Sequence, residues 1–182
     1  ITELLAQVKE LKLKFYPVFI YIIMRAVNQN REMRMQTDKE GRLGYWDECH
    51  PSYTIFHEDD KTFSDIWTEY NEDFTAFYDA VIKDMETYQN QKGIKPKPGK
   101  PDNFCPVSCV PWLSFTGYAS DTYSDSPMLY PVVLFGRYYE KEGRTFLPLG
   151  AAFHHAAADG YHSCRFLNEI QELAETFRLP RR

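Results

Sequence analysis

The chain of 182 residues lacks the features that membrane, secreted and nucleic-acid-binding proteins need. Its longest apolar stretch, residues 15–27, is interrupted by Pro17 and Arg25 and is too short to span a bilayer. No segment combines a charged start, an apolar middle and a small-residue cleavage site, so no secretion signal is visible. The formal net charge of −5 leaves no basic excess to neutralise phosphates, which argues against a nucleic-acid partner.

Cysteine is also scarce, and its spacing is uninformative for metals. The chain has 4 cysteines, at Cys49, Cys105, Cys109 and Cys164. A chain of this length can bury a sizeable core without disulfides, so we expect reduced thiols and a cytoplasmic protein. Cys105 and Cys109 lack the two-residue spacing of zinc knuckles, and the sequence therefore assigns no metal site.

Apolar residues are abundant. Hydrophobic residues make up 43% of the chain and aromatic residues 16%, which is typical of a globular protein and not of a disordered one. There are no internal repeats, and no linker divides the chain into halves that could each close a core. The sequence therefore predicts one domain over residues 1–182.

Hydrophobic periodicity predicts helices in four regions. Residues 15–30 are apolar around most of the helical circumference, which indicates a buried helix with Pro17 in its first turn. Residues 64–89 form a second predicted helix, with Ser64 or Asp65 as its N-cap. Two further helices, amphipathic, are predicted near the ends of the chain, at residues 4–11 and 166–177.

Alternating patterns predict strands and a mixed sheet. The segment 32–48 is typical of a β-hairpin, because two short runs flank the turn-rich "TDKEG". The segment 90–103 is rich in Pro, Gly and Lys and is predicted to be a surface loop. Helices interspersed with such strands indicate an α/β protein whose mixed sheet is covered by helices on one side. The remaining predicted strands lie at 52–63, 107–115, 130–139 and 145–155, the last two joined by the turn "EKEG".

The segment "AAFHHAAADGYHSCRF", residues 151–166, carries the chemistry-bearing pattern. It stands where a buried strand should end and a helix begin, so its side chains are held by rigid elements. A neutral imidazole can take a proton from a hydroxyl near neutral pH. Three interpretations stay open on the pattern alone: a catalytic histidine, a pair of packed histidines beside a helix cap, and a metal site. The metal site is disfavoured, because the adjacent His154 and His155 on a strand would point to opposite faces.

With its flanking blocks, the chain resembles the chloramphenicol acetyltransferases. "KFYPVFIYI", "EMRM", "YWDECHPSYTIFHEDDKTFSDIWTEY", "PWLSFTGY", "LPLGAAFHHAAADGYH" and "RFLNEIQEL" follow one another in that family's order. The resemblance implies the fold of the CoA-dependent acyltransferase superfamily. It also implies an acetyl-CoA-dependent O-acetyltransferase that acetylates a hydroxyl of chloramphenicol and so confers antibiotic resistance. No permanently bound cofactor is implied, since acetyl-CoA is a co-substrate.

The same resemblance implies roles for particular residues. His155 is the general base, and Asp159 is a structural aspartate that pairs with an arginine. The positions that bind coenzyme A fall on Lys14, Tyr16, Arg137 and Tyr138. The family also implies a homotrimer, with each active site between two subunits and the chloramphenicol pocket supplied largely by the neighbour of the chain that supplies the histidine.

Several positions depart from the family's pattern. A serine that stabilises the tetrahedral intermediate is matched to Gly117, and an acceptor-pocket threonine to Leu134. An aromatic residue of the pocket wall is matched to Lys95, and the block after "SF" reads "YASDTYSDSP". The family's first segment, with a strand and the arginine partner of Asp159, is expected to be lacking here. These departures leave two alternatives open: an acyltransferase for a different hydroxyl acceptor, and a non-catalytic trimeric ligand-binding homologue.

Overall fold

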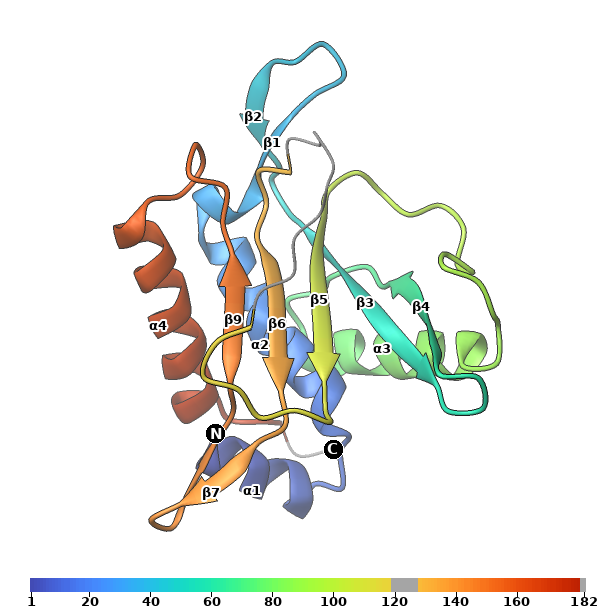
Figure 1. Cartoon of the computed structure of the whole chain (residues 1–182), viewed down its shortest axis with the longest axis vertical. Helices are drawn as coiled ribbons and strands as arrows, with labels where there is room; N and C mark the ends of the chain where they lie inside the picture. The colour runs from blue at the N-terminus through green and yellow to red at the C-terminus, as the bar shows by residue number, and fades with distance from the viewer. Residues whose placement is uncertain (119–127, 181–182) are drawn as a thin grey trace.

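A computed structural model describes residues 1–118 and 128–180 as a mixed sheet with helices packed on one face (Figure 1). This arrangement confirms the predicted fold class. The helices are α1 (Thr2–Glu10), α2 (Phe15–Gln29), α3 (Phe74–Tyr88), α4 (Gly160–Thr176) and the 3-10 turn η1 (Arg31–Arg34). The strands are β1 (Met35–Thr37), β2 (Leu43–Tyr45), β3 (His50–His57), β4 (Thr62–Trp67), β5 (Phe104–Val110), β6 (Val132–Gly136), β7 (Tyr139–Lys141), β8 (Arg144–Phe146) and β9 (Leu149–Ala152). Within the described ranges, no helix is long and apolar enough to cross a membrane.

The helix α2 lies at the centre of the core, as its apolar circumference predicts. It contacts α3 and α4 on its sides and the strands β3 and β5 of the sheet. Ile20, Ile22 and Ile23 point in different directions from the helix axis, yet each is fully buried. Pro17 stands in the first turn, where the missing backbone N–H has no intrahelical partner to lose.

The main sheet has the strand order β4-β3-β5-β6-β9. The pairs β3–β5 and β5–β6 are parallel, whereas β3–β4 and β6–β9 are antiparallel. Alternate residues of β6 separate the two faces: Val133 and Phe135 are buried beneath the helices, and Leu134 between them points to the opposite face. The strand β9 leads into the histidine motif. Because β9 is antiparallel to β6, the motif lies at the end of the sheet where β6 begins.

The predicted strand over residues 52–63 is present in part as β3, but the predicted start of the next helix, at Ser64 or Asp65, was wrong. Residues 62–67 form β4, which pairs with β3 in a six-pair antiparallel hairpin, and the helix α3 begins only at Phe74. The N-cap is Asp73, whose side chain accepts a hydrogen bond from the Ala76 N–H at 2.7 Å. Ser64 and Ile66 are fully buried, as alternate residues of a strand that packs against α3. The helical prediction arose because Ile66 and Tyr70 continue the four-residue spacing of the apolar residues in α3.

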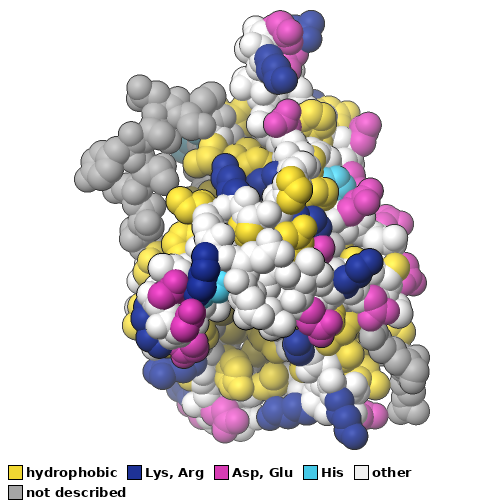
Figure 2. Space-filling view, turned by 90° about the vertical axis from the view of Figure 1, so that its right-hand side faces the viewer, with side chains coloured by type: hydrophobic (Ala, Val, Ile, Leu, Met, Phe, Trp, Pro, Cys, Tyr) yellow, Lys and Arg dark blue, Asp and Glu magenta, His cyan; other side chains and the backbone are white. Residues whose placement is uncertain are grey.

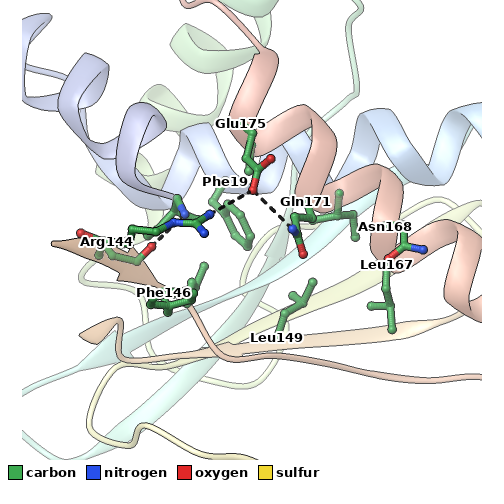
Figure 3. A pocket seen from close by; sticks show the side chains of 13 residues that line it. Phe19, Arg144, Phe146, Leu149, Leu167, Asn168, Gln171 and Glu175 are labelled. Atoms are coloured by element: carbon green, nitrogen blue, oxygen red, sulfur yellow. Dashed lines mark hydrogen bonds and ion pairs between the residues drawn. The ribbon is translucent and has the colours of Figure 1, made fainter. Parts of the chain in front are cut away.

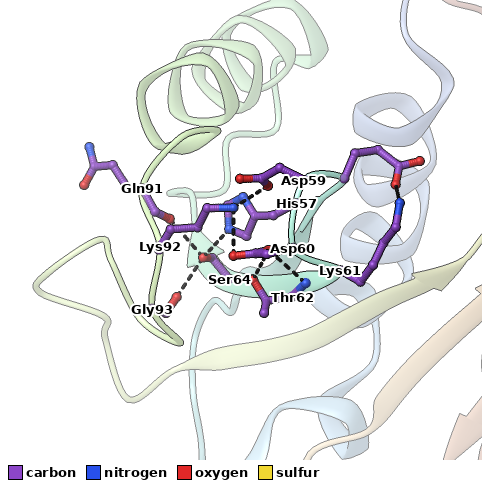
Figure 4. Close-up of polar contacts among 10 residues, drawn as sticks. His57, Asp59, Asp60, Lys61, Thr62, Ser64, Gln91, Lys92 and Gly93 are labelled. Carbon is purple, nitrogen blue, oxygen red and sulfur yellow. Dashed lines mark hydrogen bonds and ion pairs between the residues drawn. The ribbon is translucent and has the colours of Figure 1, made fainter.

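The loop 90–103 is tied to the body by three lysines. Lys92 pairs with Asp59 at 2.5 Å in the turn between β3 and β4 (Figure 4). Lys97 pairs with Asp84 of α3, and Lys100 with Asp65 of β4, each at 2.7 Å. Acidic and basic side chains are interspersed over this side of the molecule, as Figure 2 shows. The segment 90–103 is a surface loop, as predicted, and these ion pairs hold it against the β3–β4 hairpin and α3.

Two hairpins extend from the main sheet. The predicted hairpin of residues 32–48 is confirmed as β1 paired with β2. The turn "EKEG" joins β7 to β8 in a separate two-stranded sheet, so it is not a continuation of the β6–β9 ladder. Gly143 occupies the turn at φ 73°, a left-handed conformation that glycine adopts without a side-chain clash.

Candidate functional site

The histidine motif forms a compact turn between β9 and α4. The main chain leaves the sheet at Ala152 and enters α4 at Gly160. The carbonyl oxygen of His154 accepts hydrogen bonds from the N–H groups of Ala157 and Ala158, at 2.9 and 3.1 Å. Ala158 is buried, so the turn is closed by its own backbone and anchored in the core at one point.

The two histidines of the motif have different surroundings. The Nδ1 atom of His154 accepts a hydrogen bond from the Ala156 N–H at 3.2 Å, so this ring braces its own turn. The side chain of His155 is exposed, and no hydrogen bond joins its imidazole to residues 1–118 or 128–180. His155 is thus the ring of the pair that is available to a ligand or to a second subunit.

Asp159 caps the helix that follows the motif. Its Oδ1 atom accepts a hydrogen bond from the His162 N–H at 3.1 Å and lies 2.6 Å from Nδ1 of the same residue. These contacts, the backbone hydrogen bond first and the side chain second, lower the pKa of the Asp159 carboxyl below its usual value. Among the described residues, the side chain that pairs with Asp159 is that of His162.

The four positions expected to bind coenzyme A lie around two adjoining cavities. Tyr16, Arg137 and Tyr138 line an apolar cavity of about 660 Å³, together with the exposed Trp112. Lys14 lines a second cavity of about 610 Å³. The two cavities share Ile55, Phe56 and Met85 as walls. The structure therefore brings three of the four residues into one pocket and places the fourth beside it.

Tyr16 and Arg137 offer different chemistry to that pocket. The Tyr16 hydroxyl donates to the Thr54 carbonyl oxygen at 3.1 Å, and burial raises the pKa of this phenol far above its usual value, so it stays neutral. Arg137 is exposed, and its guanidinium has no carboxylate partner within 4.0 Å among the described residues. Its backbone N–H donates to the Leu113 carbonyl oxygen at 2.8 Å, which fixes the point where the chain leaves β6.

The two residues matched to the acceptor side lie away from this cavity. Leu134 stands on the sheet face opposite the helices, in register with Ser108 of β5 and Gly150 of β9. Gly117 is exposed in the loop after β5, and a Cβ added there would meet no atom within 4 Å. Lys95 is exposed on the tethered loop. Nine residues of the divergent block "YASDTYSDSP" lie outside the described ranges.

The sequence reasoning missed three residues. Ser108 carries a hydroxyl beside Leu134, and the alternation of β5 could have placed it on that face. Phe56 and Trp112 form the outer wall of the apolar cavity, with ring centroids 4.6 Å apart. Their contact joins β3 to the loop after β5, which no local sequence pattern predicts.

One further cavity contains none of the residues that the sequence predicted for the site. A cavity of about 300 Å³ lies between α4 and the β8–β9 segment, where Glu175 contacts Arg144 and Gln171 at 3.7 and 3.3 Å (Figure 3). Residues 1–118 and 128–180 contain no group of three or more His, Cys, Asp or Glu side chains that could hold a metal ion. The candidate site thus consists of the histidine turn and the apolar cavity.

These two parts lie at opposite ends of the sheet. The β6–β9 register places Val132 beside Ala152, three residues before His155, and Phe135 beside Leu149, near Arg137 (Figure 1). The five-residue advance from Val132 to Arg137 corresponds to about 17 Å along a strand. A single chain therefore presents the histidine at one end and the cavity at the other.

Comparisons with known proteins identify the family of the chain. A family model described as "Chloramphenicol acetyltransferase" matches residues 1–171. A chloramphenicol acetyltransferase of Clostridium butyricum is 46% identical over 178 residues, covering 98% of this chain and 81% of the relative. One of Vibrio anguillarum is 42% identical over 171 residues, covering 94% of this chain and 79% of the relative.

Solved structures show the same fold at lower identity. A structure named chloramphenicol acetyltransferase aligns with a TM-score of 0.81 at 22% identity, over 94% of this chain and 82% of that one. The dihydrolipoamide acetyltransferase of Azotobacter vinelandii aligns at 0.67 and 13% identity, over 96% and 73%. With the family model and the curated relatives, these findings show that the chain belongs to the chloramphenicol acetyltransferase family.

Proposed function

We propose that this protein transfers the acetyl group of acetyl-CoA to a hydroxyl of chloramphenicol, and thereby confers resistance to the antibiotic. The observation that carries the proposal is the exposed imidazole of His155, which the turn holds at the end of a strand without a hydrogen bond to the described residues. The relatives at 42–46% identity are named for this reaction. We also treat residues 1–182 as one acyltransferase domain, which the continuous core from α1 to α4 supports.

The proposed reaction is a direct transfer with His155 as general base. The imidazole takes the proton of the acceptor hydroxyl, and the hydroxyl oxygen attacks the thioester carbonyl carbon. The tetrahedral intermediate then collapses, the carbon–sulfur bond breaks, and the imidazolium returns its proton to the leaving coenzyme A thiolate. Acetyl-CoA is consumed as a co-substrate, and no permanently bound cofactor is required.

The apolar cavity is the proposed coenzyme site. Tyr16 and Tyr138 supply ring surface. The guanidinium of Arg137, which has no carboxylate partner among residues 1–118 and 128–180, stands at the cavity, where it can contact a phosphate in bidentate fashion. Lys14 lies at the neighbouring cavity and offers a second cation to the same ligand.

All four cysteines are free thiols, which supports a reducing cytoplasmic setting.

The proposed assembly is a homotrimer with sites shared between subunits. The histidine and the coenzyme cavity lie at opposite ends of one chain's sheet, so an exposed His155 needs a second subunit beside it to complete a site. A three-fold ring repeats one heterologous interface and closes on itself. Each interface would then join the histidine of one subunit to the cavity of the next.

The stabilisation of the tetrahedral intermediate involves Ser108 in this proposal. Gly117, which the family resemblance matched to a serine, carries no hydroxyl. Ser108 presents a hydroxyl on the same sheet face as Leu134, the proposed acceptor-side residue. A lost oxyanion donor costs about 10²-fold or more in rate, so this hydroxyl is worth testing directly.

A thiol-release assay with acetyl-CoA and chloramphenicol tests the function. We expect turnover by the wild type and a loss of several orders of magnitude in His155→Ala. His154→Ala is the comparison variant: its ring braces the turn through Ala156 and faces no substrate in this mechanism, so it should lose some activity but far less than His155→Ala. Activity that survives His155→Ala would contradict the mechanism.

A different hydroxyl acceptor is the second candidate function. Leu134 offers an apolar side chain where the family resemblance implies a hydroxyl, so the acceptor-side surface of this chain can favour a different alcohol. Coenzyme release with other alcohols and none with chloramphenicol would support this candidate. The His155 chemistry would be unchanged.

A further inference from the structure

A chain of polar contacts links the histidine motif to the centre of the fold. Asp159 contacts Nδ1 of His162 at 2.6 Å, and Nε2 of the same ring lies 3.7 Å from Oε1 of Glu32 on η1. The other oxygen of Glu32 accepts a hydrogen bond from Arg165 at 2.7 Å. Arg165 in turn donates to the side-chain oxygen of the buried Asn30 at 2.9 Å. The imidazole of His162 therefore lies between the carboxylates of Asp159 and Glu32.

The fixed end of this chain of contacts is rigid. Asn30 is only 1% exposed and donates to the Ala26 carbonyl oxygen at 2.8 Å and to the side chain of Glu169. Met33 on η1 is fully buried. Glu32 is thus held by Arg165 on a segment that is packed into the core, and it can serve as a fixed point for His162.

The other end of the contacts lies close to the exposed His155. The hydrogen bonds of the turn are internal to it, since the N–H groups of residues 156–158 all reach acceptors on His154. The start of the turn is packed by the ring of Phe153 against Phe166, with centroids 5.8 Å apart. At its end, the side chain of Asp159 contacts both the backbone N–H and the ring of His162.

We propose that His162 is a positioning residue for the transfer reaction. Its imidazole joins Asp159 to Glu32 and so holds the end of the turn that carries His155. The inference rests on the proposed function, in which His155 is the base. His162 does not touch the substrate; it acts through Asp159, only four residues after His155.

The positioning role predicts a particular kinetic pattern. A small displacement of a catalytic group costs up to about 10²-fold in rate, so His162→Ala should lower kcat by about tenfold or more. The Michaelis constant for acetyl-CoA should change less than about twofold, because neither Asp159 nor Glu32, the two residues that the ring contacts, lines the coenzyme cavity. A general loss of folding would instead lower the amount of active enzyme and the melting temperature together.

Amide variants separate the two contacts of the ring. The amide nitrogen of His162→Asn reaches about the position of Nδ1 and keeps the donor to Asp159, whereas that of His162→Gln reaches about the position of Nε2. Because the role needs both contacts, we expect Asn, which keeps the contact to Asp159 and loses the one to Glu32, to restore part of the activity lost in Ala, and Gln to restore less. Cys164→Ala is the matched control, since Cys164 is exposed on α4 two residues after His162. The proposal is overturned if His162→Ala keeps activity within twofold of the wild type, or if Asn and Ala are equally impaired.

An imidazole proton–nitrogen NMR spectrum tests the same role without turnover. His162→Ala should shift or broaden the ring resonances of His155, and Cys164→Ala should leave them in place. This readout distinguishes the two claims: a wild type without turnover would refute the proposed function, while unchanged His155 resonances in His162→Ala would refute the positioning role.

Discussion

Gly136→Ala should destabilise the protein and weaken coenzyme binding together. Gly136 ends β6, and a Cβ placed there would lie 2.5 Å from the Leu113 carbonyl oxygen and 2.8 Å from Cε1 of Phe115. The nearer atom belongs to the backbone, so a rotamer change cannot relieve the contact. Overpacking of this kind costs about 1–3 kcal/mol.

The cost translates into measurable shifts. For a chain of this size, each 1 kcal/mol lowers the melting temperature by about 2–4 °C, so Gly136→Ala should melt roughly 2–12 °C below the wild type. The Leu113 carbonyl oxygen also accepts the hydrogen bond from the Arg137 N–H at 2.8 Å. Displacing it should move Arg137 and raise the Michaelis constant for acetyl-CoA.

Gly150→Ala is the matched control on the neighbouring strand. A Cβ there would meet Phe115 at 3.8 Å, an ordinary van der Waals contact, so stability should change little. Calorimetric melting at equal protein concentration and a titration of acetyl-CoA in the thiol-release assay measure both effects. Equal melting temperatures for the Gly136→Ala and Gly150→Ala proteins would refute the reasoning.

Three further predictions follow from single contacts. Asp73→Ala removes the cap of α3 and should cost about 1 kcal/mol in thermal unfolding, whereas Asp73→Asn should cost less; equal losses would contradict the capping role. Ser108→Ala should lower kcat about 10²-fold if its hydroxyl stabilises the intermediate, and an unchanged kcat would exclude it. The lowered pKa of Asp159 contributes stability above the unfolded value near 3.9, which is lost as the pH falls through the folded value. The difference in melting temperature between wild type and Asp159→Asn should therefore shrink with acidification below about pH 4, and a difference independent of pH would contradict it.

The local sequence pattern was enough to predict a helix that is buried on all sides. The helix α2 is apolar on all sides, and that property needs no knowledge of its neighbours. The strand β4 was mistaken for the start of a helix because Ile66 and Tyr70 also fit a helical repeat. Its pairing with β3 makes this segment a strand. Long-range pairing of this kind is not encoded in a short window.

The candidate site, too, could be predicted from the sequence only in part. The sequence predicted that the histidine motif lies between a strand and a helix, but the strand was predicted to reach His155 and the helix to begin at Phe166. In the structure β9 ends at Ala152 and α4 begins at Gly160, so His155 lies on the turn between them. The cavity does not follow from sequence, because α2, β3, β5 and β6 each supply a wall. The contact of Asp159 with His162 was also open, since the family resemblance implied an arginine partner.

The central claim is that each active site is shared between two subunits, and mixed trimers test it most directly. His155→Ala lacks the base, and the double variant Arg137→Ala with Tyr138→Ala lacks the coenzyme cavity, so each alone should be inactive. If the two are unfolded, mixed in equal amounts and refolded, random assembly places an intact histidine beside an intact cavity at about one quarter of the interfaces. The account predicts about 25% of wild-type activity per site from this mixture. A refolded trimer with no activity above that of either variant would contradict it.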